Sequence, residues 1–152
     1  MKIEDAIKQT KPFRSVRQKA LVNLMYTSNW IEERLRRIIK PYEITIQQYN
    51  VLRILRGAGQ PLTTSVIRER LIDKMSDTSR MVDRLCKKGL VERAQCCNDR
   101  RLVDISLTGQ GLDLLREMEL KSCEFELCLS GLSAEDAEAL NHLLNKIRSK
   151  PS

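Results

Sequence analysis

Apolar residues recur at helical spacing over the first quarter of the chain. From residue 16 onward they follow one another at steps of three or four, which is the repeat of an amphipathic helix. The series is Val16, Ala20, Leu24, Thr27, Ile31, Leu35 and Ile38. Because the residue before a proline disfavours helical backbone, we expect this long helix to stop before Pro41. The polar residues 1–12 predict a short helix or a loose arm.

Two shorter helical patterns follow. Residues 45–48 read Thr-Ile-Gln-Gln, a capping-box pattern, and the apolar face of the helix that they open is expected to end at Gly57. Leu62 is expected to form a one-residue edge of a small sheet, and Thr63 or Thr64 to cap the next helix. The buried side of that helix is expected to hold Val66, Ile67, Leu71 and Ile72.

Residues 75–101 combine a charged helix with a hairpin. Ser76 or Asp77 can cap the helix, which should continue through Lys88 until Gly89 adopts a left-handed C-cap. At about 100° per residue, one face is apolar and the other is cationic and hydrogen-bonding. The first face holds Thr78, Met81, Val82 and Leu85, and the second holds Ser76, Asp77, Arg80, Asp83, Arg84 and Lys87. With the helix before it, this helix forms a helix-turn-helix.

After Gly89 the apolar pattern changes from helix to strand. Residues 90–94 and 102–107 predict two short strands, and residues 95–101 form the turn between them. The hairpin tip carries Arg100 and Arg101, which can reach a phosphate backbone or a narrow minor groove. A helix followed by such a hairpin is typical of a winged helix. We therefore predict a mainly α fold with a small β-hairpin wing.

The C-terminal third predicts two more helices. The first begins at Thr108 and continues to Leu129, where Ser130-Gly131 breaks it; the second is capped by Ser133. The apolar side of the second holds Ala137, Leu140, Leu143, Leu144 and Ile147. Together with the first long helix, these stripes exceed what one small core can cover. We expect a homodimer formed through the N- and C-terminal helices.

Charge is unevenly distributed over the 152 residues, which are enough for one domain. The net charge is +7, and residues 1–101 carry 22 Lys and Arg against 11 Asp and Glu, whereas residues 102–152 carry 5 against 9. A basic front suits a surface that faces a polyanion. A membrane is the rival polyanion, but no segment approaches ~18 uncharged apolar residues and no hydrophobic signal sequence opens the chain. We expect a cytoplasmic protein.

Three ordered blocks resemble the signature region of the MarR family of bacterial transcription regulators. They are SDTSRMVDRLCKKGLVER at residues 76–93, NDRR at 98–101 and LTGQG at 107–111. In that family the first block reads DNA, the Asp-x-Arg of the wing contacts DNA or braces the contact, and the third block opens the next helix. The resemblance implies a homodimeric winged helix-turn-helix regulator of a pseudo-palindromic operator, with repression favoured over activation. It also implies a single domain over 1–152, with a DNA-binding lobe at 41–107 and a dimerisation region at 1–40 and 108–152.

The helix faces and the resemblance together assign candidate sites. The DNA-binding residues are expected to be Thr64, Ser76, Asp77, Ser79, Arg80, Arg84, Asn98, Arg100 and Arg101. The family also implies a small-molecule effector in a pocket between the lobes, for which Tyr26, Trp30 and Tyr49 are the candidate lining residues. Packing in the core is the alternative role for these three aromatic side chains.

Nothing in the chain predicts catalysis, a metal site or a cofactor. The five cysteines match no metal or disulfide spacing, and Cys96-Cys97 beside the wing is expected to be a pair of ordinary exposed thiols. His142 lies among leucines without a partner at catalytic spacing. Two alternatives stay open: a winged-helix module that binds an acidic protein rather than DNA, and a thiol-redox enzyme. The second lacks a Cys-x-x-Cys or Cys-His pair.

Overall fold

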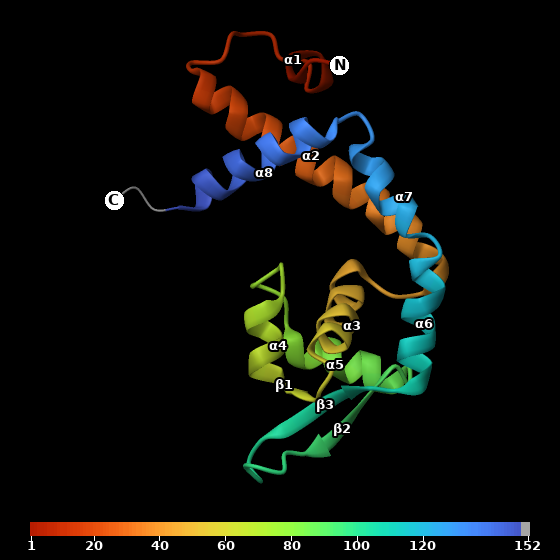
Figure 1. Ribbon diagram of the computed structural model, residues 1–152. Helices are drawn as coiled ribbons and strands as arrows, with labels where there is room; N and C mark the ends of the chain where they lie inside the picture. Colours follow the sequence, from red (N-terminus) through yellow and green to blue (C-terminus); the bar gives the residue numbers. More distant parts are fainter. Residues whose placement is uncertain (150–152) are drawn as a thin grey trace.

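A computed structural model describes residues 1–149, which form a lower lobe and an upper helical layer (Figure 1). The lower lobe contains α3 (Ile46–Ala58), β1 (Leu62–Thr63), α4 (Thr64–Arg70), α5 (Thr78–Lys87), β2 (Val91–Gln95) and β3 (Val103–Leu107). The helical layer contains α1 (Ile3–Ala6), α2 (Val16–Ile39), α7 (Ser122–Glu126), η2 (Leu127–Leu129) and α8 (Ala134–Arg148). Two segments connect them, η1 (Lys40–Tyr42) and α6 (Gly109–Glu119). The predicted mainly α winged-helix fold is confirmed.

The hydrophobic core lies in the lower lobe. Its fully buried side chains come from α3, α4, α5 and β3, together with Ile39 of α2 and Leu115 and Met118 of α6. Those with no exposed surface are Val51, Leu52, Ile67, Val82, Leu85 and Ile105. Each Å² of apolar surface removed from water stabilises the fold by about 25 cal/mol. Burial of this cluster therefore orders the helix-turn-helix and holds the sheet against it.

The small sheet is antiparallel with strand order β1-β3-β2. Leu62 lies opposite Ile105, and Val91 lies opposite Leu107. The expected edge strand at Leu62 is therefore confirmed, with Thr63 as its second residue. Because β3 is the central strand, the hairpin is attached to the core at its base and free at its tip.

Close backbone approach joins the end of α5 to the start of α6. Gly89 has φ 72°, as expected for the C-cap, and its carbonyl accepts a hydrogen bond of 2.6 Å from the Thr108 hydroxyl. At Gly111 an added Cβ would lie 2.1 Å from the Leu90 carbonyl oxygen. No side chain fits there, so this glycine is required by packing.

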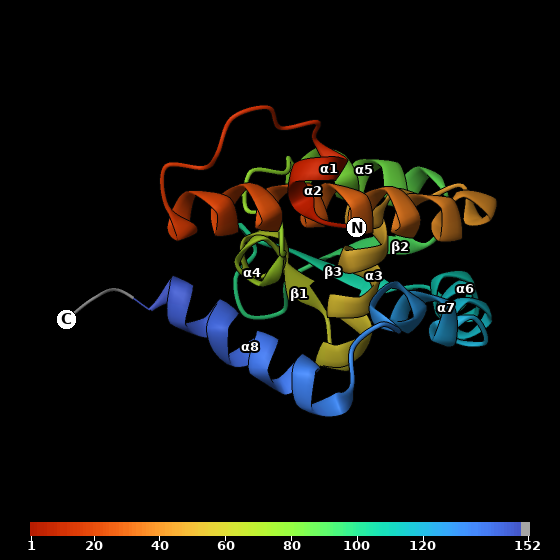
Figure 2. The same ribbon diagram turned by 90° about the horizontal axis from the view of Figure 1, so that it is seen from above.

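Few residues of the long upper helices α2 and α8 are buried. α2 has 24 residues, which is roughly 36 Å of helix, and Ile39 at its end is its one buried residue. α8 begins at the capping box of Ser133 and Asp136 and has no buried residue. The two helices overlap in Figure 1 but lie on opposite sides of α3 and α4 when seen from above (Figure 2).

Two predictions around α3 and α4 were wrong in detail. α3 continues through Gly57 to Ala58, because Gly59, with φ 63°, is the residue that takes the left-handed C-cap. Ile72 was expected in the core but is 84% exposed. α4 ends at Arg70, so the helical repeat that placed Ile72 on the buried face no longer applies. Of the two residues expected to cap α4, Thr63 is the cap, and its side chain accepts from the Val66 amide.

The continuous helix expected from Thr108 to Leu129 was also wrong. α6 ends at Glu119, and α7 begins only at Ser122. Between them Leu120 is 87% exposed, and the Lys121 amide donates to the Met118 carbonyl, three residues back rather than four. No glycine or proline marks the break, which instead turns α7 across α2 (Figure 1).

Candidate nucleic-acid interface

The helix α5 separates its two faces as its sequence predicts. Thr78, Met81, Val82 and Leu85 are buried against the core. On the other face Ser79, Arg80, Arg84 and Lys87 are exposed. The Arg80 side chain is 79% exposed, and its Nε lies 3.3 Å from the Asp77 carboxylate. This ion pair involves Nε, so the other N–H donors of the guanidinium remain available to a ligand.

The turn before α5 is stabilised by carboxylates. Asp77 caps the helix by accepting a hydrogen bond of 3.1 Å from the Arg80 amide. Asp73 accepts from the Ser76 hydroxyl at 2.7 Å and from the Met75 amide at 3.0 Å. These bonds, the Ser76 bond first, hold the pKa of Asp73 below its usual value. Ser76 and Asp77 therefore both have structural partners in the free protein.

At the wing tip, the carboxylate of Asp99 orients Arg101 but not Arg100. The Asp99 carboxylate accepts from the Arg101 backbone amide at 3.0 Å and from its side chain at 3.2 Å. The Arg101 guanidinium is the main reason that the pKa of Asp99 lies below its usual value. Arg101 nevertheless remains 90% exposed, so Asp99 orients it without covering it. Asn98 and Arg100 are exposed beside it.

An ion pair connects the helix to the wing. The Arg93 guanidinium on β2 lies 2.5 Å from the Asp83 carboxylate on α5. Each side chain is close to half exposed. Sequence reasoning placed Asp83 on the outer face of α5 but did not assign Arg93 to the site. The signal that it missed was an opposite charge two residues after the buried Val91, on the same face of the adjacent strand.

The expected DNA-binding residues thus come from three elements. Six lie on α5 and at the tip of the β2–β3 hairpin with their polar groups toward solvent, namely Ser79, Arg80, Arg84, Asn98, Arg100 and Arg101. Thr64 is the half-buried first residue of α4. The structure therefore offers one helix face and one hairpin with an exposed tip, and the Asp83–Arg93 ion pair connects the two.

The three aromatic residues expected around an effector are not gathered in one place. Tyr26 and Trp30 line a cavity of about 260 Å³ between α1 and α2. Tyr49 on α3 instead stacks on Phe125 of α7, with ring centroids 5.6 Å apart. The Arg34 guanidinium covers the Trp30 ring at 3.9 Å.

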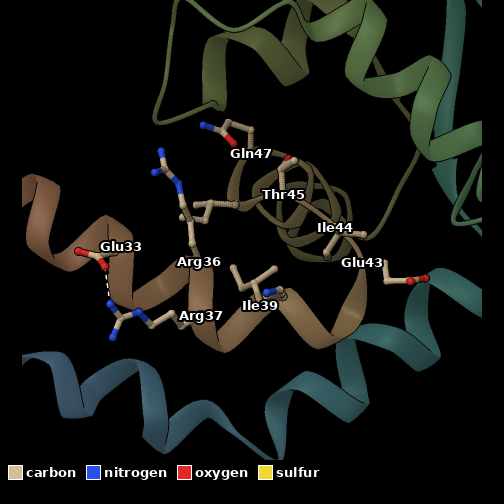
Figure 3. A pocket seen from close by; sticks show the side chains of 10 residues that line it. Glu33, Arg36, Arg37, Ile39, Glu43, Ile44, Thr45 and Gln47 are labelled. Atoms are coloured by element: carbon tan, nitrogen blue, oxygen red, sulfur yellow. Dashed lines mark hydrogen bonds and ion pairs between the residues drawn. The ribbon is translucent and has the colours of Figure 1, made fainter.

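A larger cavity of about 680 Å³ lies where α2 turns through η1 into α3 (Figure 3). Its apolar lining comes from Ile39, Ile44 and Ile46. Its polar lining comes from Glu33, Arg36, Arg37, Lys40, Glu43, Thr45 and Gln47, and Glu33 pairs with Arg37 (Figure 3). An amphiphilic molecule could place an apolar body on the isoleucines and an anionic group beside the cations. None of the three expected aromatic residues lines it.

Other chemistry is sparse in the part of the chain that the structure describes. Across residues 1–149 no three His, Cys, Asp or Glu side chains are grouped as a metal would require. The five cysteines carry free thiols, with Cys96 half-buried and Cys97 exposed beside the wing. His142 is exposed on α8. Within the same residues, no helix combines the length and apolar character needed to cross a bilayer.

Comparison with known proteins finds similarity over most of the chain. The sequence profile of the MarR family matches residues 44–103. The multiple antibiotic resistance protein MarR of Salmonella typhimurium is 31% identical over 130 residues, which cover 84% of this chain and 90% of that protein. The HTH-type transcriptional repressor IacR of Pseudomonas putida is 28% identical over 129 residues, covering 84% of this chain and 74% of the repressor.

The fold is shared with a DNA-bound relative. The crystal structure of a mutant MarR from E. coli in complex with operator DNA superposes with a TM-score of 0.77 and 26% sequence identity. The match covers 88% of this chain and 95% of that one. The similarity therefore extends over both the lower lobe and the helical layer.

Proposed function

The chain belongs to the MarR family of transcription regulators, and we propose that it represses transcription by binding a pseudo-palindromic operator as a homodimer. The observation that carries the proposal is the exposed Arg80 and Arg84 face of α5, joined to a wing with an exposed arginine at its tip. The similarity to IacR, which is named a transcriptional repressor, supports repression as the sign of regulation. No relative supports the protein-interaction alternative, and the family consists of regulators rather than enzymes.

In this proposal α5 enters the major groove. Arg80 and Arg84 can pair with the O6 and N7 acceptors of guanine, while Ser79 at the start of the helix contacts bases or phosphates. Ser76 and Asp77 order the turn that presents this end of the helix. Thr64 and the first amides of α4 face a phosphate where α4 crosses the DNA backbone.

The wing makes the second contact. Arg101, oriented by Asp99, is proposed to enter the minor groove or to contact its phosphates, with Asn98 and Arg100 beside it. The minor groove differs between DNA sequences mainly in its width. The wing therefore contributes more to affinity than to sequence preference.

The homodimer is supported by the apolar surface of the helical layer. The side chains that carry it include Leu21, Leu24, Met25, Leu140, Leu143 and Ile147, each 36–67% exposed. So many exposed apolar side chains are unfavourable in water, and a second copy of the chain would bury those of both α2 and α8. The pairing also provides two α5 helices for two half-sites.

We place a small-molecule effector in the cavity between α2 and α3 rather than beside Tyr26, Trp30 and Tyr49 together. A molecule on Ile39 and Ile46 would contact both the helical layer and the lower lobe. Binding there favours whichever dimer conformation holds the molecule more tightly, and the DNA-competent population changes accordingly.

Selection of bound duplexes from a random pool tests the function. We expect enrichment of two inverted half-sites whose centres are about one helical turn apart. Enrichment of no sequence, together with retention of an acidic protein partner in a nucleic-acid-free pull-down, would instead support the interaction-module alternative.

A further inference from the structure

The break between α6 and α7 is the point where the C-terminal helices leave the lower lobe (Figure 1). We call Leu120 and Lys121 the joint. At the joint a bond spanning three residues replaces the regular helical pattern, and Leu120 has almost no packing contact because it is 87% exposed. A helix interrupted in this way is easier to bend than a continuous one.

Contacts from the lower lobe and from η1 surround this joint on both sides. Before it, Glu119 pairs with Arg56 of α3 at 2.5 Å. Within it, the Lys121 ammonium lies 5.7 Å from the centre of the Tyr42 ring in η1. After it, Phe125 stacks on Tyr49 of α3, with an interplanar angle of 11°.

We propose that Arg56 and Tyr49 are positioning residues that hold the joint at one angle and thereby set the half-site spacing that the dimer accepts. The proposal rests on the proposed function, because spacing matters only for a dimer on DNA. None of these contacts faces the exposed side of α5 or the wing tip. Their effect is therefore on the geometry of the dimer and not on base recognition.

A change in half-site spacing displaces one half-site by a known amount, so its effect on affinity can be measured. One inserted base pair moves a half-site by about 3.4 Å along the duplex and rotates it by about 35°. A lower lobe held firmly on α6 and α7 cannot follow this displacement, whereas a lobe on a loose joint can. Loosening the joint should thus relax spacing selectivity while the preferred bases within each half-site stay the same.

The test compares affinities for the selected operator and for the same operator with one base pair added or removed between half-sites. The variants are Arg56→Met, Tyr49→Leu and the two combined. Arg116→Met is the matched control, since it removes an exposed ion pair, Arg116–Asp113 at 3.6 Å, that lies wholly within α6. For the combined variant we expect the affinity ratio between the two spacings to fall about tenfold, and for the control we expect no change.

Exchanging the charges, Arg56→Glu with Glu119→Arg, should restore the ratio lost in Arg56→Met. If Tyr49→Leu fails to fold, Arg56→Met still decides the question, because its ion pair is partly exposed, with 32% of Arg56 and 54% of Glu119 accessible. Folded variants that keep the parent's spacing ratio would overturn the proposal.

Hydrogen exchange on the DNA-free protein separates this proposal from the proposed function. Arg56→Met should accelerate exchange across residues 119–126, and Arg116→Met should not. If the parent selects no duplex, the proposed function fails while this measurement still reports on the joint. Unchanged exchange in Arg56→Met would show that Arg56 does not hold the joint.

Discussion

Arg80 and Arg101 are both exposed guanidinium groups, but they lie on surfaces that read DNA differently. Arg80 projects from the face of α5, and its nearest carboxylate is its own helix cap, Asp77. Arg101 is held by Asp99 at the tip of a hairpin. Substitution of each should therefore leave a different signature in binding data.

Arg80→Ala should flatten sequence preference. Losing a bidentate guanine contact costs about 1–3 kcal/mol of discrimination at that base pair. Anisotropy titrations on operator and scrambled duplex measure the difference, and circular dichroism confirms that the variant is folded. Retention of the parent's discrimination would remove Arg80 from the base-reading surface.

Arg101→Ala should weaken binding to many duplexes evenly and reduce the slope of log affinity against log salt by about one. Titrations at several salt concentrations give that slope. A selective loss on operator alone would instead assign base recognition to the wing.

Asp99 should not make DNA binding depend on pH near neutrality. The Arg101 guanidinium lowers its pKa in the folded protein below the ordinary 3.8. A carboxyl group with a depressed folded pKa contributes stability above its unfolded pKa and loses it only as pH falls through the lower folded value. We therefore expect Asp99→Asn to weaken DNA binding by the same factor at pH 6 and pH 8. A factor that differed between the two pH values would contradict this assignment.

The hairpin and α5 form one unit because Asp83 and Arg93 join them. Replacing either residue with alanine should lower affinity for operator by loosening the wing, while an exposed ion pair contributes only about 0.2–1 kcal/mol to folding. A double-mutant cycle on DNA affinity measures the coupling. Losses that simply add would show that the pair does not position the wing.

The two cysteines of the hairpin should have little effect on it. Cys96 is half-buried with its amide in the ladder to Leu102, and Cys97 is exposed. Replacing both with serine should leave DNA affinity and its response to peroxide nearly unchanged. A large change in either, measured on the same operator, would make the wing a thiol sensor.

For the whole molecule, the exposed stripes on α2 and α8 predict that the dimer depends on α8. Removing residues 133–152 should give a monomeric or aggregating protein with much weaker operator binding, because two half-sites are no longer linked. Light scattering determines the mass. A compact truncated protein that binds operator as the parent does would show that α8 is not needed.

Local chemistry alone determined most element ends and the face of α5. Asp77, Thr45 and Ser133 cap helices because each side-chain oxygen accepts a hydrogen bond from the amide three residues further on. Gly89 ends α5 because of its own backbone freedom. The ordered blocks at 76–111 were likewise sufficient to indicate the family, since their spacing reflects one helix, one hairpin and one helix start.

The tertiary structure decided what depends on segments far apart in the chain. Phe125 stacks on Tyr49, and Arg93 pairs with Asp83, only in the folded protein. The break at Leu120 carries no glycine or proline, and it arises where α7 leaves α6 to pack across α2. The same packing left Tyr49 away from Tyr26 and Trp30. A periodic pattern specifies which face of a helix is apolar, but the partner of that face is set by the three-dimensional arrangement of the others.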